Sequence, residues 1–414
     1  MSVHVATILG LVVMFVFATA LPINMGALGL TAAFVVGSLF VDMSAAQILT
    51  GFPGDLFVTL VGITYLFAIA ESNGTVDLLV HYGVKVTGGR VAVIPWVMFF
   101  IAALLTSIGA VSPGAMAILA PVAMRFAYRH GINPMLMGLM VTHGCQAGGF
   151  SPISIYGGIT NQVMERAGLV GNDMVLFLAS FAFNFAIGVV ISIIFRAKPG
   201  AAKADATNEM MTRSDAGVLN AQRALTLVAL LALAVGTLAF NLNVGFVAIS
   251  AAVVLAIAFP AAQKGAVEKA AWSTVLLICG VITYVAVLQK AGTVDWIGEG
   301  AAHMGAPLLA VLLLCYVAGI VSAFASSVGV LGATIPLAVP LLAQGHLSAV
   351  GVVAAIAVAT TIVDASPFST NGALLLANTK AAEREAVFKR LLIYGGVMTA
   401  FGPFFAWLFL ALPG

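Results

Sequence analysis

The chain reads Gly148-Gly149-Phe150-Ser151-Pro152 in the middle of one long apolar segment and Asp364-Ala365-Ser366-Pro367 in the middle of another. These segments, about 134–166 and 347–380, are too long for one straight span. Roughly 33 residues at 1.5 Å each cover about 50 Å, whereas the hydrocarbon core of a bilayer is about 30 Å thick. We therefore expect two discontinuous helices whose broken ends lie at membrane depth.

Apolar segments make up nearly the whole chain. Of the 414 residues, 62% are hydrophobic and 8% are charged, whereas about 25% of a soluble domain is charged. Stretches of about 20 apolar residues, the length of a transmembrane helix, follow one another from Val5 almost to the C-terminus. This composition excludes a soluble fold and predicts an all-α integral membrane protein in contact with the lipid bilayer. The net charge of +2 is spread over loops, so no nucleic-acid partner is expected.

The second half of the chain repeats the first. At an offset of 215 positions, Ser107, Ser112, Gly114 and Pro121 return as Ser322, Ser327, Gly329 and Pro336, and both breaks contain Ser-Pro. We predict an N-terminal repeat (1–195), a polar cytoplasmic linker (196–223) and a C-terminal repeat (224–414). Duplicated halves of this length are typical of secondary transporters.

The positive charges predict the orientation of the two repeats. Each repeat contains five predicted spans and one hairpin, and an odd number of spans inverts the second repeat relative to the first. With the N- and C-termini outside, all Lys and Arg residues except Arg166 and Lys290 fall on the cytoplasmic side, in agreement with the positive-inside rule. We predict a multi-pass protein of the bacterial inner membrane, with interfacial amphipathic helices near Asp77 and Asp295.

The two hairpins, about 91–128 and 307–343, turn without a charged residue. Their turns span 107–114 and 322–329. We predict re-entrant tips, because irregular backbone at membrane depth is tolerated only where it lines a cavity or is covered by protein. The alternative is a close contact between small-residue helices, and the recurrence of the turns in both halves favours re-entrant tips.

The broken helices and the tips together define the predicted binding site. A half-helix N-terminus offers free N–H groups and a partial positive charge, which suit a carboxylate. No Lys or Arg lies at the centre of any predicted span, so we expect hydroxyls, amides and helix ends to hold a small dianion. The predicted substrate ligands are Ser112, Ser151, Ser154, Ser327, Ser369, Thr370 and Asn371.

Asp364 is the acidic residue that we place at membrane depth. An intramembrane ionisable group is a functional hypothesis by default, and we expect Asp364 to bind a coupling cation or carry a proton. The alternative is a structural carboxylate that caps backbone N–H groups. His143 also falls in the first broken helix, where a single histidine is more commonly a packed, hydrogen-bonded residue.

Three stretches resemble the MatC-type malonate and dicarboxylate carriers, namely 52–57, 64–70 and 148–161. The resemblance is dense from about Leu21 to Phe195. More distantly, the hairpins and broken helices resemble the divalent anion:sodium symporters of the ion transporter superfamily. This second resemblance implies a homodimer that moves a transport domain past a scaffold as an elevator.

The same resemblance implies two sodium sites. In those symporters a Ser-Asn-Thr signature at each tip binds sodium and a substrate carboxylate, and here the aligned positions read Val111-Ser112-Pro113 and Ser326-Ser327-Val328. Because the signature is not kept, protons remain an alternative to sodium, with Asp364 as their carrier. Carried over residue by residue, one cation site would contain Ser107, Ser112 and the Gly148 backbone, and the other Ser322, Ser326, Ser327 and the Ala365 backbone.

These observations predict a secondary transporter that imports a small dicarboxylate by cation symport, with malonate as the first expectation. The alternative is the membrane subunit of a sodium-pumping decarboxylase, which also has inverted halves and requires soluble partner subunits. An enzyme is not expected, because the sequence offers no nucleophile–base pair or metal cluster near the membrane surface. No cofactor is expected besides coupling sodium ions or protons.

Overall fold

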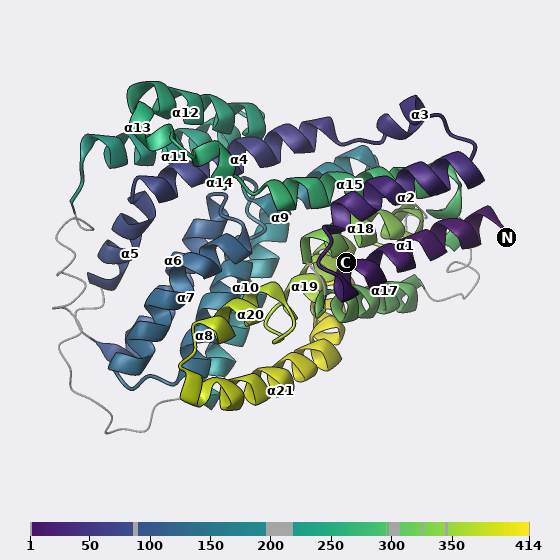
Figure 1. The fold of residues 1–414 in the computed structure, drawn as a ribbon. Coiled ribbons are helices and arrows are strands. Elements are labelled where there is room, and N and C mark those ends of the chain that lie inside the picture. The colour runs from purple at the N-terminus through teal and green to yellow at the C-terminus, as the bar shows by residue number, and fades with distance from the viewer. Residues whose placement is uncertain are drawn as a thin grey trace.

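The computed structural model describes residues 2–85, 90–195, 218–294, 296–297, 307–324, 327–343 and 347–413. Every regular element within these ranges is helical (Figure 1). Five of the described helices are long and apolar enough to cross a membrane, and seven shorter apolar helices accompany them. The all-helical fold and the apolar helices expected from the composition are confirmed.

The first half of the chain contains ten α-helices and a short 3-10 helix in the described residues. They are α1 Val3–Ala20, α2 Met25–Phe40, α3 Ala45–Leu49, α4 Gly54–Ser72, α5 Thr75–Lys85, η1 Val91–Val93, α6 Ile94–Ser107, α7 Ser112–Arg129, α8 Pro134–Gly148, α9 Ile155–Arg166 and α10 Asp173–Ile194.

The second half follows the same order. Its described elements are α11 Ala221–Leu238, α12 Val244–Ala258, α13 Pro260–Gln263, α14 Ala266–Lys269, α15 Trp272–Lys290, α17 Pro307–Ser322, α18 Ser327–Ala343, α19 Ala349–Thr361, α20 Thr370–Ala377, α21 Ala381–Ala406 and the π-helical η2 Trp407–Ala411.

Each half places a helical hairpin before a broken helix. The hairpins are α6–α7 and α17–α18, the broken helices are α8–α9 and α19–α20, and all four lie where the sequence predicts them. Part of the predicted linker, 196–217, lies outside the described residues, as do Asp295 and Ser326. The division into repeats and the inverted orientation of the second repeat stay predictions.

Small residues hold the two halves together at close helix contacts. α4 packs on α12, and α15 packs on α2. A Cβ built at Gly62 would lie 2.5 Å from the Gly245 carbonyl oxygen, and a Cβ at Gly26 would overlap the backbone of Leu276. Such backbone-to-backbone approach is the usual way in which helices associate in lipid, where the hydrophobic effect between helices is absent.

The two halves also exchange their second half-helices. α20 of the second half packs against α7 of the first hairpin, and α9 of the first half packs against α18 of the second hairpin. Leu375 on α20 accordingly belongs to the apolar core that α6, α7 and α8 form, whereas Ile159 on α9 belongs to the core that contains α18 and α19. In Figure 1 these elements meet in the middle of the molecule. Each hairpin therefore contacts the broken helices of both halves.

Gly148 allows the first hairpin to approach the first break. A Cβ at this position would overlap the Ala103 carbonyl oxygen and would lie 2.7 Å from the Ser107 Oγ. Gly148 is fully buried at the end of α8, the helix on which α6 packs most extensively. The close approach of tip and break thus depends on the missing side chain.

α5 is amphipathic, in agreement with the predicted interfacial helix. Val76 and Val80 are 3% exposed, whereas Asp77 and Lys85 are exposed. The corresponding stretch of the second half is described only at residues 296–297, where the Trp296 ring stacks on His4 with 5.3 Å between ring centroids.

The three cysteines permit a labelling test of the predicted orientation. Cys145, Cys279 and Cys315 are buried, so a membrane-impermeant maleimide should leave the unsubstituted chain unlabelled. Val170 is 85% exposed between α9 and α10, and the Glu385 side chain is 82% exposed on α21. We expect Val170→Cys to be labelled in intact cells and Glu385→Cys only after permeabilisation. The reverse pattern would contradict the orientation.

Gly148→Ala should destabilise the protein, because the added methyl group overlaps the first hairpin. Overpacking of this kind costs about 1–3 kcal/mol, and the expected result is a lower apparent Tm and a smaller monodisperse peak in detergent. Gly114→Ala is the matched control, since a Cβ there meets nothing within 4 Å. Equal stability of the two variants would show that the tip and the break are not packed as described.

Candidate functional site

The first hairpin turns over four residues between α6 and α7. Gly109 has a φ of +113°, a conformation that glycine adopts readily, and Ala110 and Ser112 are 3% and 2% exposed. α7 then begins with Ser112-Pro113, and its N-cap residue Val111 offers no side chain to accept from the first N–H groups. A partly positive helix end without a side-chain cap therefore lies at this tip.

Serine hydroxyls bond the first break to the first tip. The Ser107 Oγ donates to the Gly148 carbonyl oxygen at 3.3 Å, and the Ser151 Oγ donates to the Ser107 carbonyl oxygen at 2.5 Å. Ser154 is the N-cap of α9, since its Oγ accepts from the Gly157 N–H at 3.2 Å and donates to the Ser151 carbonyl oxygen at 2.7 Å. The hydroxyls thus replace the backbone bonds that the break removes.

The second break repeats this pattern. Ser369 is the N-cap of α20, where its Oγ accepts from the Gly372 N–H at 3.3 Å and donates to the Ser366 carbonyl oxygen at 2.7 Å. Ser154 and Ser369 therefore perform the same structural task at equivalent positions of the two halves. Their predicted contact with substrate stays a prediction beside this capping role.

The second tip contains a pair of bonded serines. The Ser322 Oγ and the Ser327 Oγ are 2.8 Å apart and are 0% and 3% exposed. Ser326, which the resemblance assigns to the same cation site, lies outside the described residues. In the described part of this tip, the hydroxyl pair links the last residue of α17 to the first residue of α18.

Asp364 lies at the junction between the second break and the first hairpin. Its side chain is 3% exposed, and the Asn371 Nδ2 donates to its Oδ2 at 3.1 Å. The same Nδ2 donates to the Ser112 Oγ at 2.8 Å. The Ser369 and Ser327 hydroxyls and the Asn371 backbone N–H also lie within hydrogen-bonding reach of the carboxylate. We call Asp364, Asn371, Ser112 and Ser327 the junction cluster.

The junction cluster brings together residues of both tips and of the second break. Among the described residues, the groups that interact with the Asp364 carboxylate are neutral hydroxyls, a side-chain amide and a backbone N–H. A carboxylate buried among neutral donors is costly to keep charged unless a proton or a bound cation neutralises it. The cluster can therefore hold a proton or a cation together with an anionic ligand.

The predicted site residues divide between the cluster and the breaks. Ser107, Gly148 and Ser151 form a separate hydrogen-bonded group. Ser112 is bonded to Asn371 on α20, and its predicted cation site with Ser107 and Gly148 stays a prediction. Thr370 is exposed at the start of α20, and Ala365 is 1% exposed in the apolar core beneath the first hairpin.

Two polar residues near the breaks were not predicted from the sequence. The Tyr156 hydroxyl interacts with the Ser112 side chain, and Tyr156 also interacts electrostatically with Asp364. It is the repeat equivalent of Asn371 at the offset of 215 positions, and that equivalence is the signal that could have identified it. Gln146 is fully buried on α8, and neither its Oε1 nor its Nε2 has a hydrogen-bond partner among the described residues.

His143 is a packed residue whose two ring nitrogens are both engaged. Its Nδ1 lies 2.8 Å from the Asn184 Oδ1, and its Nε2 lies 2.5 Å from the Tyr394 hydroxyl. The side chain is fully buried between α8, α10 and α21. It belongs to no group of three or more His, Cys, Asp or Glu side chains that could hold a metal in the described part of the chain.

Comparison with known proteins finds a matching family model for the first part of the chain and a similar fold for nearly all of it. Residues 1–149 match the family model described as the N-terminus of dicarboxylate carrier protein MatC. No curated protein sequence matches the chain. The fold is similar to that in a crystal structure of the Alcanivorax borkumensis YdaH transporter, which is described as having an unusual topology.

The structural match extends over both halves. The TM-score is 0.61 at 15% sequence identity, over 89% of this chain and 87% of the other. At this identity the similarity concerns the fold alone. The expected resemblance to the MatC-type carriers is thus confirmed over residues 1–149, and the fold of the chain is similar to that of the YdaH structure.

Proposed function

We propose that the protein is a secondary transporter that imports a small dicarboxylate by cation symport, with malonate as the first substrate to test. The match to a dicarboxylate carrier family supports the substrate class. The observation that carries the proposal is the junction cluster, in which a buried carboxylate from one half is bonded through Asn371 to the hairpin tip of the other half.

The charges in the site support an anionic substrate that arrives with cations. The N-terminus of α7, which has no side-chain cap, and the N-terminus of α20 both offer partial positive charge and N–H donors to a carboxylate. Asp364 would repel the same substrate unless it were neutralised. A cation or proton at Asp364 therefore removes the repulsion, which couples the binding of the two ligands.

The membrane potential sets the number of cations. Moving a dianion into an interior-negative cell costs about 4.6 kcal/mol per 100 mV, at about 2.3 kcal/mol per charge. At least two cations must therefore accompany each substrate. Asp364 accounts for one of them, and the hydroxyl and carbonyl oxygens of Ser107, Gly148, Ser322 and Ala365 are the proposed ligands of a sodium ion.

The proposed cycle uses inverted halves in a homodimer of the bacterial inner membrane. The exchange of half-helices ties each hairpin to the breaks of both halves, so the hairpins and broken helices would move together as a transport domain. The first experiment is uptake of labelled malonate and longer diacids by proteoliposomes, with sodium and proton gradients imposed separately. Absence of gradient-driven uptake of every diacid would contradict the proposed function.

Asp364→Asn should abolish concentrative uptake and leave substrate exchange across the membrane in place. Asparagine keeps the shape of the side chain, and its amide oxygen can still accept a hydrogen bond from Asn371. Because asparagine is uncharged, it cannot take up a coupling proton and offers no negative charge to a coupling cation. Accumulation and counterflow of labelled malonate measure the two activities. Asp77→Asn, an exposed position on α5, is the matched control. Wild-type accumulation in Asp364→Asn would assign Asp364 a purely structural role.

Ser112→Ala and Ser327→Ala should each weaken cation-dependent uptake without removing the protein from the membrane. Each loses one hydroxyl of the junction cluster, and a lost hydrogen bond of about 1 kcal/mol raises the apparent KM about fivefold. The cation dependence of malonate uptake is the measurement. Ser250→Ala, an exposed position on α12, is the control. Normal uptake kinetics in both Ser112→Ala and Ser327→Ala would show that the binding site lies elsewhere.

A further inference from the structure

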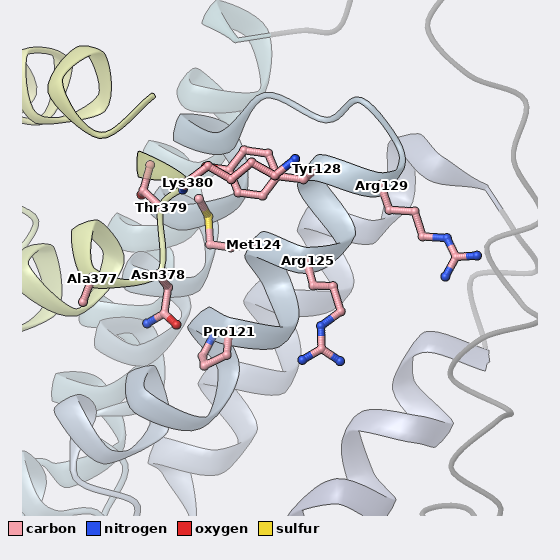
Figure 2. Close-up of a pocket in the computed structure, with 9 residues that line it drawn as sticks. All are labelled: Pro121, Met124, Arg125, Tyr128, Arg129, Ala377, Asn378, Thr379 and Lys380. Carbon is pink, nitrogen blue, oxygen red and sulfur yellow. The ribbon is translucent and has the colours of Figure 1, made fainter. Parts of the chain in front are cut away.

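A basic cavity opens at the far end of the two helices that meet in the junction cluster (Figure 2). Its volume is about 620 Å³. The polar side chains that line it are Arg125, Tyr128, Arg129, Asn378, Thr379 and Lys380. α7 begins at Ser112 in the junction cluster, and its last turns line the cavity. α20 has Asn371 of the cluster in its first turn, and its last residue Ala377 and the link to α21 line the cavity.

The cavity and the junction cluster are therefore two ends of one helix contact. α20 packs on α7 and contains 8 residues, so it spans only about 12 Å at 1.5 Å per residue. Along α20, the junction cluster and the cavity are therefore about two helical turns apart.

Arg125 and Lys380 carry positive charge at the cavity, and Glu383 is the acidic residue that acts electrostatically on the lining residue Tyr128. Neither Arg125 nor Lys380 has a carboxylate within 4 Å in the described ranges, where the ion pairs lie elsewhere. Lys380 lies over the Tyr128 ring, with its Nζ 4.4 Å from the centroid, and its backbone N–H donates to the Tyr128 hydroxyl at 3.0 Å. Figure 2 shows the Arg125 guanidinium and the Asn378 amide pointing the same way, while Arg129 points away from them.

The repeat shows that these charges are not a by-product of duplication. At the offset of 215 positions, Arg125 corresponds to Pro340 and Lys380 corresponds to Glu165. The equivalent place in the other half therefore has no basic residue at either position. At these two positions, the basic residue is present only in the half of the pair that lines the cavity.

We propose that this cavity is a second, weaker dicarboxylate site, a vestibule that holds the substrate by Arg125 and Lys380 as it enters or leaves the junction cluster on this face. The inference rests on the proposed function for its substrate. The volume lies within the usual range of about 300–1,000 Å³ for small-molecule sites. Its openness and its point charges favour weak, rapidly exchanging binding of a dianion.

The test measures the malonate KM separately on the two faces, in whole cells and in inside-out membrane vesicles. Arg125→Gln and Lys380→Gln should each raise the KM about fivefold on the face that carries Lys380, because a nearby unit charge is lost. The KM on the other face and the final accumulation ratio should stay unchanged. The effect should shrink as ionic strength rises. Lys389→Gln, which removes the same charge from an exposed pair with Glu385 on α21, is the control.

A labelling assay tests occupancy without transport. Ala377 lines the cavity and is exposed, so Ala377→Cys should react with a maleimide, and malonate should slow that reaction several-fold. Adding Arg125→Gln should remove the protection. Protection by phosphatidylglycerol with none by malonate would assign the cavity to a lipid headgroup and overturn the inference.

The two proposals fail in different ways. Gradient-driven malonate uptake with a wild-type KM on both faces in Arg125→Gln and Lys380→Gln would overturn the vestibule and leave the proposed function intact. Absence of any diacid uptake by the unsubstituted protein would overturn the proposed function. Malonate protection of Ala377→Cys in that case would show an anion site that serves another purpose, which also overturns the vestibule as a substrate mouth.

Discussion

A helix that breaks inside a bilayer must have its freed backbone groups satisfied by protein, because no water is available to them. In this chain the serines of the breaks meet that requirement. Ser154 and Ser369 cap the second half-helices, and Ser107 and Ser151 tie the first tip to the first break. The first hairpin therefore takes part in the hydrogen bonding of the first broken helix.

The exchange of half-helices turns two such units into one site. α20 fills the core of the first hairpin and α9 fills that of the second, so a ligand at the junction touches both halves. The halves are not chemically equal, however. Gly149 occupies the position equivalent to Asp364, and Tyr156 occupies that equivalent to Asn371. The two halves thus share the same order of hairpin and broken helix, but only the second break has a carboxylate, Asp364, at this position.

The two kinds of positive charge have separate places in this frame. Helix ends and neutral donors surround the buried junction, where a Lys or Arg side chain would be costly to desolvate and would hold a dianion too tightly to release it. Formal charges from Arg125 and Lys380 stand at the open cavity, where water pays most of their solvation. In the proposed transport cycle, binding at the junction cluster and capture at the cavity would therefore use different physics along the same pair of helices.

The sequence by itself predicted the all-helical fold with its apolar helices, the two hairpins and the two breaks, and the structure has helices in these places. These follow from local properties, namely apolar length, Ser-Pro interruptions and a repeat at a fixed offset. It also singled out Asp364, because an acidic residue in an apolar stretch is conspicuous without any structure. The family match over residues 1–149 contains two of the stretches that carry the resemblance, 52–57 and 64–70, whereas the third, 148–161, lies almost wholly beyond it.

Only the tertiary structure decided which residues meet. The sequence assigned Ser112 both to a cation site with Ser107 and Gly148 and to the substrate ligands with Asn371, and the fold bonds Ser112 to Asn371, which is 259 positions away. The repeat offset could have pointed to Tyr156, but only the fold shows that its hydroxyl interacts with Ser112. The basic cavity was missed because its residues come from α7 and from the end of α20, which lie side by side only in the folded chain. Contacts across exchanged half-helices depend on how whole helices pack, and no local pattern of residue types records that arrangement.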